Sequence, residues 1–290
     1  MKPRSLITTL FGDYIQFYGW EIWVGSLIEM LGKFGISESS VRGAILRMNK
    51  QDLLTVRKVG NKSYYTVSPK GKLRIEDGVK RVYSIGNNKW DGNWRIVSYS
   101  MPEEMRDLRN QVRKELTWIG FGMLSNSVWI SPNYIEKQVM DMISHYKLED
   151  YTVLFSSSTI ISHKNEEIIY KAWDLNTLSK EYESFIHEFQ GKYDYFKEKA
   201  WEGRLSDEEC FIERTRLVHE YRKFLFKDPG FPYDLLPADW IGIRAKELFF
   251  NIHQLISIGA VRYFETVFVK APDLDAKVQR EKALSPFSDI

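Results

Sequence analysis

The chain has 290 residues, of which 43% are hydrophobic and 28% charged, and its formal net charge is only +2. This length favours two or three domains with sizeable cores, and the composition is ordinary for a folded protein. The single Cys210 excludes an internal disulfide and favours a reducing compartment, so we expect a cytoplasmic protein. The sequence contains no apolar run of about 18 residues and no apolar stretch typical of a signal peptide, so we expect no membrane partner.

Most of the positive charge lies in one short segment. Between Arg42 and Arg74 there are nine basic residues and one acidic residue, Asp52, so this segment carries +8 in a chain of +2. A local excess of this kind is typical of a surface that meets the phosphate backbone of a nucleic acid. A solvated basic face on an ordinary domain is the alternative, and the order of the predicted elements favours the nucleic acid.

Two consecutive helices are predicted at the start of this segment. Residues 21–35 predict a helix that ends at a glycine-containing turn, and Ser37 is a candidate N-cap of a second helix, with Glu38 in its first turn. The apolar residues of this second helix share one face: Val41, Ala44, Ile45 and Met48. The opposite face and its flank carry Ser39, Ser40, Arg42, Gly43, Leu46, Arg47 and Lys50. This pattern predicts a helix-turn-helix whose second helix enters the major groove of DNA.

A β-hairpin is predicted directly after the second helix. Residues 53–60 and 63–69 are rich in β-forming side chains, and the Gly-Asn-Lys sequence between them is a turn signal. Helix, turn, helix and hairpin together predict a winged-helix DNA-binding domain over residues 1–84. The predicted wing would offer phosphate-contacting and groove-contacting side chains: Arg57, Lys58, Asn61, Lys62, Ser63 and Tyr64.

The segment from 90 to 176 predicts a second domain. Its strand and helix signals follow the order βαββαβ, which is typical of a ferredoxin-like sandwich. Three arginines, Arg106, Arg109 and Arg113, lie on its first helix. We expect either a solvated helix face or a site for an acyl group or phosphates.

The rest of the chain predicts a helical domain over residues 177–275, followed by a flexible tail over 276–290. A capping box begins at Ser206, and a bend rich in proline and glycine, residues 228–242, connects two amphipathic helices. Such a bend either packs a core or forms an interface with a second subunit. The complete fold expected is α+β, with a winged helix-turn-helix, a central ferredoxin-like α/β sandwich and a C-terminal helical domain.

In three blocks the chain resembles the PaaX family, the repressors of phenylacetate catabolism: residues 39–54 followed by the hairpin at 60–71, residues 90–132 and residues 221–249. The resemblance implies a homodimer that binds operator DNA, represses catabolic genes and is released by an aryl-acyl-coenzyme A thioester. Tryptophans in the later domains, together with the arginines after Pro102, would supply the thioester site. The candidates are Arg106, Arg109, Arg113, Trp129 and Trp240.

The central segment also resembles the small CRISPR-associated endoribonucleases, so a metal-dependent nuclease is an alternative. Those enzymes need an aspartate at the end of the first strand, where this chain has Ser100, and a neutral serine is a poor ligand for a hard cation. The five histidines are far apart, and phosphate-binding or nucleophile motifs are missing. We therefore expect no enzyme activity, cofactor or metal site. An RNA-binding protein, the other alternative, would need exposed aromatic side chains on a sheet.

Overall fold

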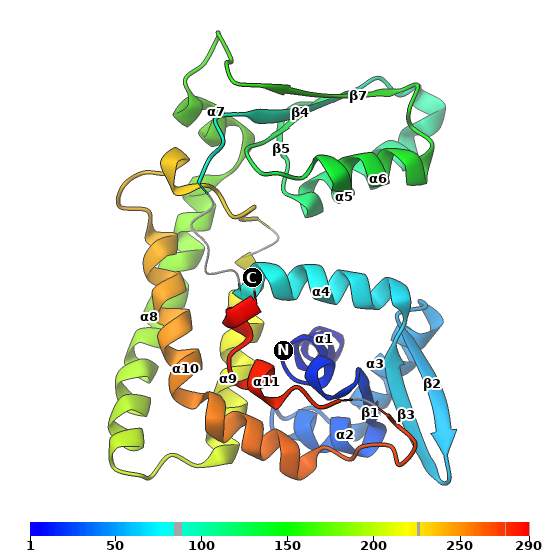
Figure 1. Cartoon of the computed structure of the whole chain (residues 1–290), viewed down its shortest axis with the longest axis vertical. Coiled ribbons are helices and arrows are strands. Elements are labelled where there is room, and N and C mark those ends of the chain that lie inside the picture. The colour runs from blue at the N-terminus through cyan, green and yellow to red at the C-terminus, as the bar shows by residue number, and fades with distance from the viewer. Residues whose placement is uncertain (84–88, 225–226, 276, 290) are drawn as a thin grey trace. The chain divides into compact units, whose positions relative to one another are not determined.

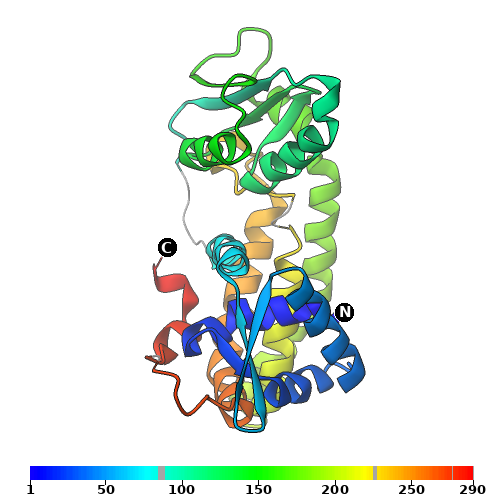
Figure 2. The same cartoon turned by 90° about the vertical axis from the view of Figure 1, so that its right-hand side faces the viewer.

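The computed structural model describes residues 1–83, 89–224, 227–275 and 277–289, and shows an α+β protein with two antiparallel sheets (Figure 1 and Figure 2). The chain divides into two compact units. Unit 1 contains Met1–Ile85, Phe185–Arg222 and Ala245–Ile290, and unit 2 contains Gly86–Ser184 and Lys223–Arg244. No helix in the described part of the chain is long and apolar enough to cross a membrane.

This division differs from the three consecutive domains that the sequence suggested. The segment 177–275 does not form a unit of its own, because its residues are shared between units 1 and 2. The two long helices α8 (Leu175–Trp201) and α10 (Ile241–Val267) contribute to both units. Residues 84–88, at the boundary between the two domains expected at 1–84 and 90–176, and residues 225–226 lie outside the described residues.

Unit 1 begins with helices and strands packed around α1. The elements are α1 (Pro3–Asp13), η1 (Ile15–Tyr18), β1 (Glu21–Trp23), α2 (Val24–Gly32), α3 (Glu38–Lys50), β2 (Leu54–Val59), β3 (Lys62–Val67) and α4 (Pro69–Tyr83). The three strands form an antiparallel sheet in the order β1-β3-β2. Leu6, Leu10 and Phe11 on α1 are fully buried, so this helix lies at the centre of the unit.

The helix predicted over residues 21–35 is correct only in part. Residues Glu21–Trp23 instead form the short strand β1, and the helix begins at Val24. The reason is long-range: these three residues pair with Thr66, Tyr65 and Tyr64 of β3. A three-residue strand has no periodicity of its own that could reveal it in the sequence.

The C-terminal half of the chain completes unit 1. It supplies α9 (Asp207–Tyr221), part of α10, α11 (Arg280–Leu284) and η5 (Pro286–Asp289). Ser206 caps α9 as the sequence predicts, since its Oγ accepts a hydrogen bond from the Glu209 amide at 3.2 Å. Tyr14 of the N-terminal region stacks on Phe264 of α10 with ring centroids 5.0 Å apart.

The expected flexible tail is a packed segment. Residues 268–275 and 277–289, here called the C-terminal strap, run back along unit 1 and are drawn from orange to red in Figure 1. The Gln279 amide donates to the Phe17 carbonyl at 2.8 Å, and Ala283 is fully buried. Phe287 packs against the rings of Tyr83 and His253, at 5.1 and 5.0 Å. The composition of the strap did not predict this, because its partners lie up to about 260 residues away in the sequence.

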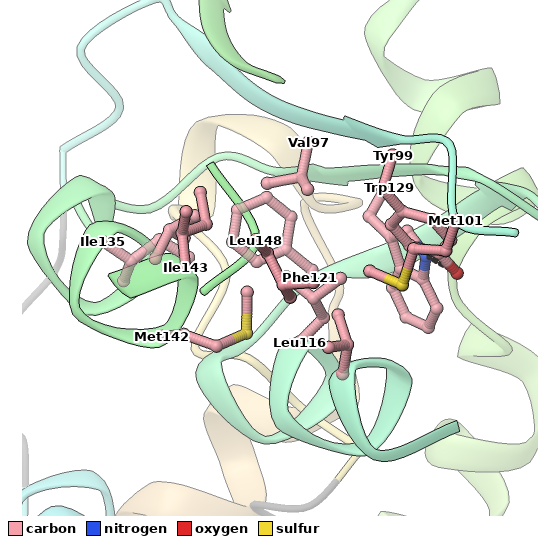
Figure 3. Close-up of a cluster of buried hydrophobic side chains, with 12 residues drawn as sticks. Val97, Tyr99, Met101, Leu116, Phe121, Trp129, Ile135, Met142, Ile143 and Leu148 are labelled. Atoms are coloured by element: carbon pink, nitrogen blue, oxygen red, sulfur yellow. Dashed lines mark hydrogen bonds between the residues drawn. The ribbon is translucent and has the colours of Figure 1, made fainter. Parts of the chain in front are cut away.

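Unit 2 has the strand and helix order βαββαβ that the sequence predicts. The elements are β4 (Trp94–Tyr99), η2 (Glu103–Met105), α5 (Arg106–Ile119), β5 (Gly122–Ser125), β6 (Val128–Ser131), α6 (Glu136–Tyr146), β7 (Thr152–Ser157) and α7 (Asn165–Ala172). The strands form one antiparallel sheet in the order β5-β6-β4-β7. Helices α5 and α6 cover one face of this sheet, and Figure 3 shows the buried side chains between them, including Val97, Leu116 and Ile143.

The proline-rich bend packs within unit 2. Phe231, Leu235 and Trp240 are buried, and Phe231 lies edge-on to Trp173 at 5.0 Å. Asp228 accepts a hydrogen bond from the Tyr182 hydroxyl at 2.7 Å. The sequence left two roles open for the bend, core packing or an interface with a second subunit, and these contacts are typical of core packing.

Candidate nucleic-acid interface

The helix α3 begins where the sequence predicts and presents one polar face to solvent. The Ser37 hydroxyl accepts a hydrogen bond from the Ser40 amide at 3.3 Å and so caps the helix. The apolar face is buried: Val41, Ala44, Ile45 and Met48 are at most 4% exposed. This burial fixes the rotation of the helix, and the opposite face is therefore held outward by core packing.

The outward face of α3 carries the residues that the sequence singled out. Those exposed to solvent are Ser39, Ser40, Arg42, Leu46, Arg47 and Lys50, with Gly43 half-buried among them. A Cβ atom at Gly43 would meet only the Arg47 guanidinium, at 3.4 Å, so packing does not require a glycine here. The missing side chain lets another surface approach the backbone of α3 closely at this position. Within the described part of the chain, Arg47 and Lys50 make no ion pair.

Arg42 differs from the other two basic residues on this face because it has an acidic partner. Its Nε and Nη2 both lie 2.7 Å from Oε1 of Glu38, one turn earlier on α3. Both side chains are more than half exposed. An exposed pair of this type contributes little to stability, so Arg42 can leave Glu38 at little cost.

The hairpin that follows α3 has a two-residue turn and an exposed basic tip. Lys62 opens β3 and pairs with Val59, the last residue of β2. Gly60 adopts a φ of 60°, which glycine reaches without the steric penalty of other residues. Lys58 and Asn61 are exposed, and the Lys62 ammonium lies over the ring of Trp23 at 4.5 Å. The cation–π contact positions Lys62 while leaving its ammonium near the surface.

Two of the predicted hairpin residues are not available at the surface in the way that the sequence suggested. Tyr64 is only 1% exposed and pairs with both Trp23 and Arg57 across the sheet. Arg57 bonds to Glu21 of β1 and to Asp273 of the C-terminal strap. The Glu21 and Asp273 carboxylates raise the pKa of Arg57, so its charge is permanent but already compensated. Ser63 is half-buried beside them.

Among the effector candidates, Arg113 and Trp129 share one partner, because Arg113 Nε and Trp129 Nε1 both donate to the Tyr99 hydroxyl, at 3.1 and 3.4 Å. Trp129 belongs to the core between the sheet and helices α5 and α6, and Trp240 packs edge-on against Tyr182 at 6.1 Å. Arg109 donates to Glu103 at 2.8 Å, while Arg113 donates to Tyr99 and to the Asn126 carbonyl. Arg106 is exposed. These contacts do not by themselves define a site for a thioester, so the candidate residues stay predictions.

A metal-dependent nuclease would need a group of metal ligands in unit 2, and an RNA-binding protein would need exposed aromatic side chains on its sheet. Ser100 follows β4, where its amide donates to the Tyr151 carbonyl at 2.9 Å. Among the described residues, no three His, Cys, Asp or Glu side chains are grouped so that they could hold a metal ion. Of the aromatic residues on the strands of this sheet, Phe155 is 46% exposed, whereas Trp94, Tyr99 and Trp129 are buried. One exposed ring does not form the stacking platform of an RNA-binding sheet.

Three acidic residues at the candidate interface were not foreseen from the sequence as partners of its arginines. Glu38 stands four residues before Arg42, and this i,i+4 spacing was the one signal that could have revealed their pairing. Glu21 and Asp273 lie 36 and 216 residues from Arg57. No local pattern in the sequence links them.

Comparison with known proteins covers most of the chain. Family models match residues 2–71 (PaaX-like protein), 87–169 (PaaX protein central Cas2-like domain) and 173–266 (PaaX-like protein C-terminal domain). The Transcriptional repressor PaaX of Escherichia coli (strain K12) is 32% identical over 267 residues, which is 91% of this chain and 83% of that protein. The solved structure of the uncharacterized protein Rv0674 from Mycobacterium tuberculosis matches with a TM-score of 0.53 and 20% identity, over 90% of this chain and 96% of that one, and so supports the fold. These matches, over the interface and over both units, show that the chain belongs to the PaaX family of transcriptional repressors.

Proposed function

We propose that residues 1–83 form a winged helix-turn-helix that binds double-stranded operator DNA. Helix α3 enters the major groove and the β2–β3 hairpin lies along the phosphate backbone. The observation that carries this proposal is a set of basic residues on consecutive elements: the exposed Arg42, Arg47, Lys50 and Lys58, and the half-buried Lys62. Burial of the opposite face of α3 orients the three helix residues together, as a reading helix requires.

Unit 2, in this proposal, carries a ferredoxin-like sandwich that serves as a regulatory rather than a catalytic domain. The element order βαββαβ and the strand order β5-β6-β4-β7 support the fold name. The neutral Ser100 supports the regulatory role over a nuclease, because a serine hydroxyl is a poor ligand for a hard cation.

The biological role that we propose is that of a cytoplasmic repressor of catabolic genes for phenylacetate or a similar aromatic acid. Family membership supports this role, as does the name of the E. coli relative. Release from DNA would follow binding of an aryl-acyl-coenzyme A thioester that favours a conformation unsuited to the operator. By thermodynamic reciprocity, operator DNA would weaken binding of the thioester by the same factor.

A homodimer completes the proposal, because one helix specifies too few base pairs to find a genomic site. Two-fold symmetry then predicts a palindromic operator with half-sites separated by whole turns of about 10 base pairs. Sedimentation at micromolar concentration, with and without operator DNA, tests the dimer, and a monomer under both conditions would contradict it.

The decisive experiment for DNA binding is titration of fluorescently labelled DNA from upstream of the protein's own gene. We expect binding that exceeds that of shuffled DNA by about 10³-fold or more at physiological salt. Phenylacetyl-coenzyme A, and not the free acid, is expected to release the DNA. Equal affinity for specific and shuffled DNA would contradict the function, whereas specific binding that ignores aryl thioesters would contradict the effector alone.

A further inference from the structure

The guanidinium of Arg57, in the middle of strand β2, is held from two sides. On its inner side, Nε and Nη2 donate to the two carboxylate oxygens of Glu21, at 2.6 and 2.7 Å. The Glu21 side chain is only 5% exposed and also accepts a hydrogen bond from Thr66 at 3.2 Å. This buried carboxylate therefore fixes the plane of the guanidinium and the direction of its other edge.

The outer edge of the same guanidinium holds Asp273. Nη1 donates to Oδ2 at 2.6 Å and Nη2 to Oδ1 at 3.0 Å, a second two-pronged contact. The Asp273 side chain is 58% exposed, in contrast to Glu21. One guanidinium thus faces two carboxylates, and the pair on the outer side is the one in contact with solvent.

Asp273 belongs to the C-terminal strap, which is anchored on both sides of it by other contacts. Ala271 is 2% exposed, and its carbonyl accepts from the Leu274 amide at 3.1 Å. Farther on, Gln279 bonds to the Phe17 carbonyl, and Arg280 pairs with Glu265 at 2.9 Å. Release of Asp273 would consequently free a short exposed turn and leave the rest of the strap in place.

The outer edge of Arg57 has the donor geometry that recognises a phosphate. A guanidinium binds carboxylate and phosphate groups in the same two-pronged manner, so either anion fits this edge. Arg57 lies on β2, one residue before the exposed Lys58 of the hairpin. Since the Asp273 pair is exposed, it is weak and can exchange with another anion.

We propose that the outer edge of Arg57 is a preorganised anion site on the hairpin, that Asp273 occupies it in the free protein, and that a nucleic-acid phosphate takes its place on binding. This inference rests on the proposed function, and it adds that Asp273 of the strap limits the affinity for DNA. Glu21 stays in contact with Arg57 in both states. Asp273 is therefore an internal competitor of the DNA backbone.

The test compares Asp273→Asn with Asp275→Asn. Asp275 is exposed in the same strap, two residues away, and the substitution changes the net charge by the same amount. We expect Asp273→Asn to bind operator DNA about 2- to 5-fold more tightly than Asp275→Asn. In an Arg57→Lys background this difference should disappear, because a lysine has no second edge to release. Equal affinities for the two single variants in the wild-type background would overturn the inference while leaving the DNA-binding function intact.

A second measurement separates failure of the inference from failure of the proposed function. Hydrogen exchange at the Leu274 amide reports the turn that holds Asp273, and it needs no DNA. We expect this amide to exchange faster in Asp273→Asn than in Asp275→Asn. In the wild type, we expect exchange to become faster when either operator DNA or inorganic polyphosphate is added. If the wild type binds no DNA but polyphosphate still accelerates this exchange, the anion site survives and the proposed function fails. Unchanged exchange with both polyanions overturns the anion site.

Discussion

Arg214 of α9 forms a fully buried ion pair with Asp13 of α1. Its Nη2 lies 2.8 Å from Oδ1 and its Nε 3.1 Å from Oδ2, and both side chains are 0% exposed. The Tyr83 hydroxyl also donates to Asp13, and Ser257 contacts both Arg214 and His253. Helices α1, α4, α9 and α10 therefore meet at one polar cluster inside unit 1, which joins the N-terminal helices α1 and α4 to the C-terminal helices α9 and α10.

Loss of one partner from this pair should destabilise the protein strongly. In Asp13→Asn the Arg214 charge stays buried without its counter-ion, and we expect a loss of about 3–5 kcal/mol in the free energy of unfolding. Urea denaturation measures this loss. The double variant Asp13→Leu with Arg214→Met removes both charges and should recover much of it. A double variant no more stable than the single one would contradict this account.

The buried His253 should make stability depend on pH. Burial and the neighbouring Arg214 charge lower the pKa of His253 from 6.5 to about 4, despite the attraction of Asp13 3.9 Å away. Because the unfolded chain binds this proton first, stability falls as the pH drops from about 6.5 to 4, by up to about 3 kcal/mol.

Asp13 and His253 affect the stability of the protein in different pH ranges. Burial alone would raise this pKa, but Arg214 and His253 lower it from 3.8 to about 2, so its stabilising contribution is lost only below about pH 4. A comparison of urea denaturation at pH 7 and pH 5 therefore excludes the contribution of Asp13, and a variant of His253 separates this residue from the other histidines. A His253→Gln variant should lose less stability between these two pH values than the wild type, and an equal loss would rule out His253 as the cause.

The pairing of Arg42 with Glu38 leads to opposite expectations for the two residues. Arg42→Ala should weaken binding to operator DNA by about 1–3 kcal/mol and relax sequence preference, because a base contact is removed. Glu38→Gln removes the intrahelical competitor and one negative charge, so it should strengthen binding. Fluorescence anisotropy on specific and shuffled DNA measures both effects. Unchanged specificity in Arg42→Ala would show that another side chain reads the bases.

Lys58 and Lys62 of the hairpin should act through phosphates and not through bases. Neutralising both should weaken binding to all DNA sequences similarly and reduce the slope of log K against log salt by about 0.9 for each phosphate that is no longer neutralised. Lys180→Ala combined with Lys197→Ala on α8 is a control with the same change in net charge, since both lysines are exposed and far along the chain from the candidate interface. A double variant with the slope of the control would place the hairpin away from the DNA.

The packed strap predicts that its aromatic anchor matters for stability. Phe287 is 8% exposed and contacts Tyr83, Phe250 and His253. Phe287→Ala should lower the free energy of unfolding by about 3 kcal/mol, whereas Val278→Ala, at a 41% exposed position in the same strap, should be nearly neutral. Equal free energies of unfolding for the two variants would contradict the packing of the strap against unit 1.

Local patterns were sufficient for the parts of the fold whose cause is local. The burial of Val41 and Met48 on α3 follows from helical spacing, the Ser37 and Ser206 caps follow from side-chain chemistry, and the βαββαβ order follows from alternating periodicities. The outward face of α3 follows from the same periodicity, because a buried stripe fixes the side opposite to it.

Tertiary structure alone decided which charges of the interface are free and which are compensated. Arg57 and Lys58 are adjacent and equally basic in the sequence, yet Arg57 bonds to Glu21 and Asp273 while Lys58 faces solvent. The strand β1, the sharing of residues 177–275 between two units and the packing of the strap have the same origin. Ion pairs, short strands and buried tails depend on residues that only folding brings within a few ångströms, and sequence periodicity carries no information about such distances.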